Sequence, residues 1–105
     1  MKTKAVIPRE QAAHDIEEAL EYYLEAAGDV VASAFVDALE QALNHVARHP
    51  ASGSLRYAHE LDLPALRCWR VRDYPYLLFY VEREDHIDLW RVLHGERDLP
   101  VWMRA

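Results

Sequence analysis

Cysteine, glycine and long apolar runs are all scarce in this 105-residue chain, and each shortage excludes a kind of protein or site. A single cysteine, Cys68, cannot form an internal disulfide, which fits a reducing compartment. The three glycines lie too far apart to form a glycine-rich phosphate loop. The longest apolar stretch, residues 74–81, is far too short to span a membrane. We therefore expect a soluble cytoplasmic protein.

The charge is acidic overall but unevenly distributed. Eighteen acidic residues against twelve basic ones give a net charge of −6, which argues against non-specific binding to polyanions through the overall field. Residues 1–49 hold nine acids and four bases, whereas residues 50–105 hold nine acids and eight bases, all of them arginine. With 51% hydrophobic and 29% charged residues, the composition is that of a folded domain, and the length predicts one domain over residues 1–105.

Apolar residues between Ile7 and His49 recur at helical spacing and predict two amphipathic helices. Gly28 followed by Asp29 is typical of a helix end and a new N-cap, so the helices should form an antiparallel hairpin, and Pro50 should end the second helix. The predicted buried positions are Ile16, Ala19, Leu20, Tyr23, Leu24 and Ala27, then Val31, Phe35, Ala38, Leu39, Ala42 and Val46. The predicted solvent-exposed acids are Glu17, Glu18, Glu21, Glu25, Asp37 and Glu40.

The remaining segments alternate with period two and predict strands. A short strand over residues 4–7 should end at Pro8, and residues 51–64 should form a loop. Residues 66–72, 76–82 and 87–94, joined by tight turns at 73–75 and 83–85, predict an antiparallel meander. The expected fold is α+β, a helical hairpin packed on one face of a twisted antiparallel sheet, in the order β-α-α-β-β-β.

Two isolated features favour ordinary structural roles. Cys68 lies in the middle of a predicted strand, where a buried core thiol is more typical than a nucleophile. His45 and His49 are four residues apart, but no further ligands of matching spacing follow them. Their position near the end of a helix favours an interaction with the helix dipole, and we expect neither a metal nor a cofactor.

The arginines of the predicted sheet leave two interpretations open. Arg70 and Arg72 should share one face of their strand with Leu66 and Cys68, and Arg91 should share a face of the last strand with Ile87, Leu89 and Leu93. If those strands lie near each other, the arginines form a basic patch suited to phosphate or carboxylate groups. Equally, they can pair with Asp73, Asp88 or Asp98 as exposed ion pairs of little energetic value.

Two stretches of the second half resemble a known family. Residues 72–81 read RDYPYLLFYV and residues 89–98 read LWRVLHGERD. They are similar to the C-terminal half of the RelE/ParE superfamily of type II toxin–antitoxin toxins, closest to the ParE, or plasmid stabilisation, branch. The first half is similar as well, with a strand ending in proline and a glycine between two helices. The resemblance implies a helical hairpin on a twisted antiparallel sheet.

The superfamily implies two rival activities. RelE-type members cut mRNA on the ribosome with basic side chains and a tail tyrosine or histidine, whereas ParE-type members poison DNA gyrase. Arg72 and Arg97 stand where the ribonucleases keep phosphate-stabilising arginines, but Trp102 and Met103 occupy the acid–base position of the tail. Indole and thioether groups have no useful proton-transfer chemistry near neutral pH. The lysine pair of the ribonucleases is also missing, because the lysines are confined to residues 2 and 4.

The prediction is therefore a binding-type toxin that inhibits DNA gyrase and is neutralised by a cognate antitoxin, rather than an enzyme. The predicted target-binding residues are Arg70, Arg72, Arg91, His94, Arg97 and Trp102. The antitoxin is expected to be a DNA-binding module with a tail that folds around the toxin. For the toxin itself, neither sequence-specific DNA binding nor membrane binding is expected.

Two alternatives remain. One is a ribosome-dependent endoribonuclease of RelE type, in which Arg72 and Arg97 are catalytic and His49, His59 or His94 replaces the missing proton-transfer group. The other is a non-toxic interaction module of the same fold.

Overall fold

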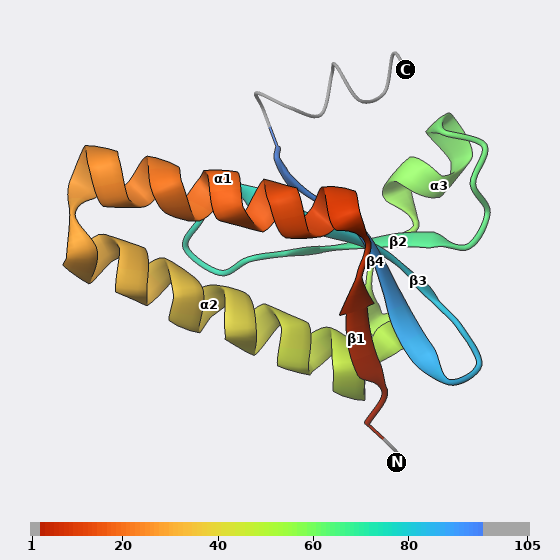
Figure 1. Cartoon of the computed structure of the whole chain (residues 1–105). Coiled ribbons are helices and arrows are strands. Elements are labelled where there is room, and N and C mark those ends of the chain that lie inside the picture. The colour runs from red at the N-terminus through yellow and green to blue at the C-terminus, as the bar shows by residue number, and fades with distance from the viewer. Residues whose placement is uncertain (1–2, 96–105) are drawn as a thin grey trace.

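The structure is a computed structural model, and it describes residues 3–95. The predicted α+β class and the chain order of the strands and long helices are confirmed (Figure 1). The segment predicted as a plain loop, residues 51–64, instead contains most of a short 3₁₀ turn and a one-turn helix. The elements are β1 (Ala5–Pro8), α1 (Glu10–Ala27), α2 (Asp29–Arg48), the 3₁₀ turn (Pro50–Ser52), α3 (Arg56–Glu60), β2 (Leu66–Arg70), β3 (Tyr76–Glu82) and β4 (His86–His94).

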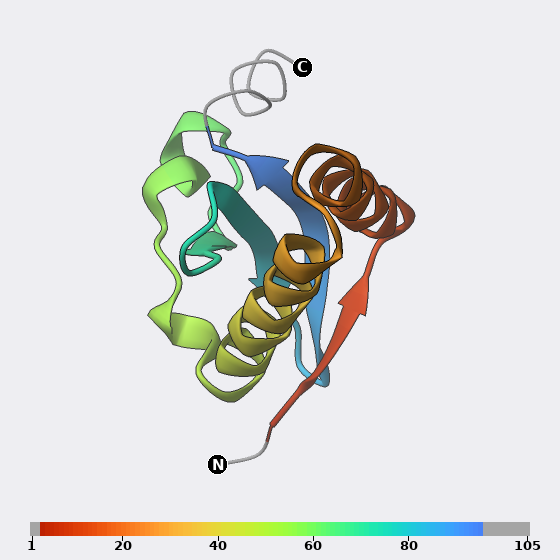
Figure 2. The ribbon, with the colours of Figure 1, turned by 90° about the vertical axis from the view of Figure 1, so that its left-hand side faces the viewer.

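The four strands form one sheet in the order β1-β4-β3-β2, with β1 and β2 at its opposite edges (Figure 2). Strands β2, β3 and β4 form the predicted antiparallel meander. Strand β1, however, pairs in parallel with β4, from Ala5 opposite His86 to Pro8 opposite Leu89, so the sheet is mixed and not antiparallel throughout. A turn sets the direction only of strands that are adjacent in sequence; the helical hairpin between β1 and the meander allows either direction.

One glycine makes the link between the two long helices. Gly28 has φ 86°, a conformation that costs glycine little, and it is both the C-cap of α1 and the N-cap of α2. The sequence predicted Asp29 as the N-cap of α2, but Asp29 is the first residue of the helix. Its charge still suits the helix N-terminus. Within residues 3–95, none of the helices has the length and apolar character needed to cross a membrane.

The sheet is covered on both faces, where the sequence predicted a cover only for one. On one side lies the hairpin, and on the other lies α3 (Figure 1). The hairpin-side core consists of Ala12, Ala19, Phe35, Leu39, Ala42, Val46, Val71, Tyr76, Leu78, Tyr80, Ile87, Leu89 and Val92. The α3-side core consists of Tyr57, Ala58, Leu66, Cys68, Phe79, Val81 and Leu93. The six predicted exposed acids of the hairpin are all exposed, but Leu24, predicted to be buried, is 44% exposed.

A β-bulge in β4 overturns the predicted alternation of that strand. Phe79 pairs with Arg91 and Tyr80 pairs with Leu89, so Trp90 is an extra residue in β4. Residues 87 and 89 share one face, as the alternation predicts, and join the hairpin-side core. Beyond the bulge Val92 takes that side and Leu93, predicted to share the face of residues 87 and 89, joins the α3-side core. One inserted residue is enough to exchange the two faces of the strand, because side chains alternate with a period of two.

A buried ion pair joins α1 to the centre of the sheet. The Nε and Nη2 groups of Arg91 donate to the two carboxylate oxygens of Asp15, at 2.8 and 3.0 Å, and the backbone N–H of Val92 donates to the same carboxylate at 3.0 Å. The side chain of Asp15 is only 7% exposed and that of Arg91 is 26% exposed. Asp15 is thus an acid within the buried face of α1, and it fixes the helix against the strand immediately after the bulge.

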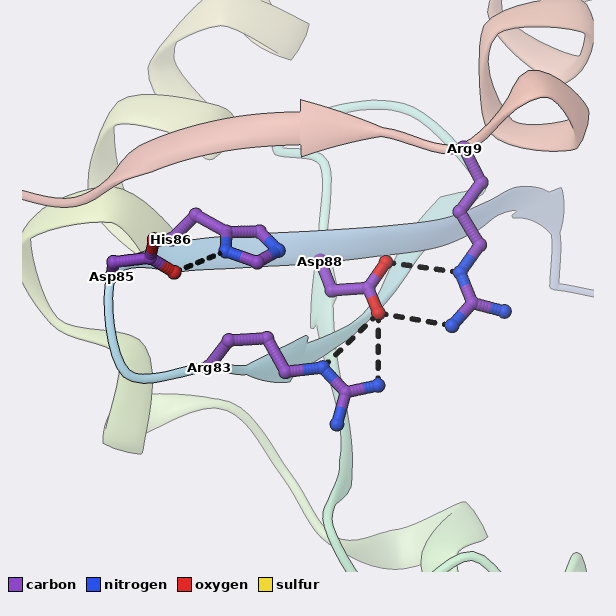
Figure 3. Close-up of polar contacts among 5 residues, drawn as sticks. All are labelled: Arg9, Arg83, Asp85, His86 and Asp88. Carbon is purple, nitrogen blue, oxygen red and sulfur yellow. Dashed lines mark hydrogen bonds and ion pairs between the residues drawn. The ribbon is translucent and has the colours of Figure 1, made fainter.

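A second carboxylate joins the start of α1 to the β3–β4 turn (Figure 3). Asp88 accepts hydrogen bonds from Arg9 and from Arg83, with N···O distances of 3.0–3.2 Å. The guanidinium of Arg9 also lies 4.3 Å from the ring centre of Trp90. Burial raises the pKa of Asp88, but the neighbouring polar groups of Arg9, Trp90 and Arg83, together with the charge of Arg9, outweigh that effect and lower the pKa to about 2.

Replacing Asp15 by asparagine should lower the free energy of unfolding by about 3 kcal/mol, because it leaves the Arg91 guanidinium partly buried without its counter-charge. Urea unfolding followed by circular dichroism measures the loss. The matched control is Asp37→Asn on the exposed face of α2, which should change the stability by less than about 0.5 kcal/mol. Equal stability of the two variants would show that the buried pair does not hold the hairpin on the sheet.

Asp88 should contribute a pH-dependent share of the stability. Its pKa is lower in the folded chain than the ordinary 3.8, so its contribution is complete above pH 3.8 and disappears as the pH falls through about 2. That contribution is on the order of 2 kcal/mol. The stability difference between the wild type and Asp88→Asn should therefore be larger at pH 6 than at pH 2.5. For Glu84→Gln, an exposed change in the adjacent turn, the stability difference from the wild type should be the same at both pH values. If the stability of all three proteins changes equally with pH, Asp88 does not make this contribution.

Candidate functional site

Most arginines of the sheet are already engaged in holding the fold together. Arg83 binds Asp88, and Arg91 binds Asp15. Arg67 donates from Nη1 to the backbone oxygens of residues 51 and 53, at 3.1 and 2.8 Å. These side chains fasten loops, turns and helices to the sheet, so their charges are largely neutralised or directed at backbone carbonyls.

Arg70 and Arg72 are different. Both are exposed, and within residues 3–95 neither forms an ion pair or a side-chain hydrogen bond. Arg70 is the last residue of β2, at the edge of the sheet, and Arg72 follows buried Val71 in the turn toward β3. The backbone at the end of β2 therefore positions both arginines, and in the described part of the chain no side-chain partner holds them.

The other predicted site residues lie elsewhere. Strand β3 separates β2 from β4, so Arg91 is not next to Arg70 and Arg72, and the patch across those two strands does not form. His94 ends β4, where its ring lies edge-on to Tyr76 with 5.5 Å between ring centres. Arg97 and Trp102 fall outside the residues that the structure describes.

Two cavities lie on the two sides of the β2 edge, and both are lined by Trp69 and Arg70. The cavity on the hairpin side, here called the α2 cavity, has a volume of about 440 Å³. The cavity on the α3 side, here called the α3 cavity, has a volume of about 350 Å³. Residues lining the α2 cavity are Ala38, Gln41, Ala42, His45, Trp69, Arg70 and Arg72. Residues lining the α3 cavity are Ser52, Ser54, Arg56, Tyr57, Cys68, Trp69, Arg70 and Leu77. We call Trp69, Arg70 and Arg72 the arginine edge.

His45 lies in the α2 cavity and is firmly oriented. Its ring stacks on the ring of Trp69, with 3.9 Å between centres and 13° between planes. The hydroxyl of Ser52 donates to the backbone oxygen of His49 at 2.7 Å, so it has no proton left for His45, and His45 Nε2, 2.9 Å away, must be the donor to Ser52 Oγ. Burial of the ring, and then the neighbouring His49, lower the pKa of His45, which favours its neutral form at pH 7.

The remaining candidates from the sequence have structural surroundings. Cys68 is buried, as predicted, and burial raises the pKa of its thiol against the opposing effects of Arg56 and Ser54. A protonated, buried thiol is a poor nucleophile. Within residues 3–95, no group of three or more histidine, cysteine, aspartate or glutamate side chains is arranged to hold a metal ion.

The arginine edge therefore offers hydrogen-bond donors and positive charge beside an aromatic ring. Guanidinium groups in this setting bind carboxylates and phosphates through paired N–H groups. The alternating pattern of β2 identified both arginines from the sequence. Trp69, His45 and Gln41 were missed as part of the site, because their proximity depends on how α2 packs against β2.

Comparison with known proteins gives the family. Residues 6–99 match the sequence model of a family described as "ParE toxin of type II toxin-antitoxin system, parDE". A solved structure from the chromosomal ParDE TA system of P. aeruginosa superposes with a TM-score of 0.74 and 16% sequence identity, over 90% of this chain and 98% of that chain, which supports the fold. A search of curated proteins found no match. Because the family model spans nearly the whole sequence, this chain belongs to the ParE toxin family of type II toxin–antitoxin systems.

Proposed function

We propose that this ParE-family toxin acts by binding, that its target is DNA gyrase, and that a cognate antitoxin neutralises it. The observation that carries the binding mode is the arginine edge: two exposed guanidiniums with no carboxylate partner in residues 3–95. An unpaired, solvent-exposed cation is available to a partner, whereas Arg83 and Arg91 would have to give up an internal carboxylate first.

The chemistry at this edge favours binding over catalysis. The imidazole in the α2 cavity, that of His45, has its Nε2 proton directed to Ser52 and one ring face against Trp69. Proton transfer to a substrate needs a group within hydrogen-bond reach of the reacting atom. We place Arg70 and Arg72 at the centre of the target interface. Participation of Arg91, His94, Arg97 and Trp102 stays a prediction.

The antitoxin partner has a separate supporting observation at the tip of the helical hairpin. Tyr22, Leu24 and Val30 are 51%, 44% and 84% exposed, although all three are large apolar side chains. Covering such side chains with a partner removes apolar surface from water, which favours binding. We propose that the tail of the antitoxin covers this tip together with exposed parts of the sheet, in the cytoplasm, where both proteins act.

One observation favours a second candidate function. His45, Arg70 and Arg72 line the same cavity, and an imidazole beside guanidiniums is a combination that phosphodiester cleavage can use. The ribosome-dependent endoribonuclease therefore remains the alternative to test.

Purified gyrase tests the proposed target. The wild-type toxin should inhibit DNA supercoiling, and the double variant Arg70→Gln/Arg72→Gln should need at least about a hundredfold more protein for the same inhibition, because it loses two charge-assisted interactions worth about 1.5–3 kcal/mol each. Arg48→Gln removes one exposed charge from the end of α2, outside the arginine edge, and should inhibit like the wild type. Absence of inhibition by the folded wild-type protein would refute gyrase as the target.

Primer extension on translated mRNA tests the alternative. The binding proposal predicts no new cleavage when the wild-type chain is added to a translation reaction. In-frame cuts that disappear in both Arg72→Ala and His45→Ala, with circular dichroism confirming that the variants fold, would instead establish the endoribonuclease.

A further inference from the structure

The α2 cavity is positively charged, and its charge is not used by the fold. Arg70 and Arg72 line it, and none of the described residues that line it is acidic. The other groups in the lining are neutral, including His45, whose pKa is lowered by burial and by His49. A concave site lined by charge of one sign concentrates counter-ions of the opposite sign.

The acids nearest in sequence do not neutralise it. On α2, Asp37 and Glu40 each precede a residue that lines the cavity, and Asp73 follows Arg72 in the turn, where it has φ 69°. All three are exposed, none lines the cavity, and none is paired with an arginine in residues 3–95. The two guanidiniums therefore keep their attraction for an external anion.

The walls of the cavity suit a flat ring as well as an anion. Ala38, Ala42 and Trp69 provide apolar surface, and the amide of Gln41 provides one donor and one acceptor group for a polar ring edge. A volume of about 440 Å³ lies in the range of sites that hold small organic ligands. Apolar surface with a few polar groups is the ordinary composition of such sites.

We propose that the α2 cavity binds a phosphate ester, with Arg70 and Arg72 on the phosphate and an attached ring against Ala38, Ala42 and Trp69. A phosphate monoester carries a charge of about −1.5 to −2 at pH 7, which matches two guanidiniums better than a single carboxylate does. The source can be a free nucleotide, with one monoester, or a single-stranded nucleic acid, whose successive backbone diesters each bring one negative charge. This site is independent of gyrase being the target, because it rests only on the lining of the cavity.

Titrations followed by ¹H–¹⁵N NMR on the purified full chain test the proposal. The probes are 5′-AMP, adenosine, inorganic phosphate and a ten-residue oligothymidylate. 5′-AMP should shift the side-chain signals of Gln41 and Trp69, and should bind at least about tenfold more tightly than adenosine, which lacks the charged group. Tighter binding of the oligonucleotide than of 5′-AMP would assign the phosphate to a nucleic-acid backbone; the reverse would assign it to a free nucleotide.

Matched variants separate this cavity from the other side of the sheet edge. Arg70→Gln/Arg72→Gln should weaken 5′-AMP binding more than about tenfold. Arg56→Gln removes an exposed charge from the α3 cavity instead, and this variant should bind 5′-AMP like the wild type. Three results would overturn the proposal: no shifts with 5′-AMP, shifts confined to residues outside the α2 cavity, or equal weakening by the Arg56 variant. A gyrase assay that fails leaves all these expectations unchanged.

Discussion

The fold depends on one buried carboxylate that joins its two halves. Asp15, on the inner face of α1, receives two hydrogen bonds from Arg91 and one from the backbone of Val92. A carboxylate with so little exposure is costly to desolvate, and three donors at 2.8–3.0 Å compensate it. The contact sets the position of α1 on β4 just beyond the bulge at Trp90, and the rest of the hairpin follows from that position.

Internal pairing divides the arginines into those that hold the fold together and those that remain available to a partner. Arg9, Arg83 and Arg91 are taken up by internal carboxylates, and Arg67 by loop carbonyls. Arg70 and Arg72 are left at the sheet edge without such partners in the described chain. An acidic protein thereby presents a local basic surface. Net charge describes the long-range field, whereas recognition at contact distance depends on which charges remain unpaired.

The location of this surface also explains why it can be shared by two cavities. Strand β2 is an edge strand, and its outer side is joined to the preceding loop by the bridge between Ser54 and Cys68 and by the hydrogen bonds of Arg67 to residues 51 and 53. Its last residues, Trp69 and Arg70, therefore contribute to both the α2 cavity and the α3 cavity. A residue of a central strand would be covered by neighbours on both sides. Functional groups at the end of an edge strand combine a rigid position with access to a partner.

The sequence alone determined the features that depend on local periodicity. Helical spacing predicted the hairpin and its exposed acids, and period-two alternation predicted the meander. The motifs at residues 72–81 and 89–98 predicted the family. It also marked Arg70 and Arg72 as candidates. Tertiary structure alone decided the parallel pairing of β1, the reversal of faces after Trp90, the pairing of Arg91 with Asp15, and the stacking of His45 on Trp69. The physical reason is distance along the chain. Local patterns report which face of its own element a side chain takes, while a partner many residues away is chosen by packing and by the need to satisfy every buried charge.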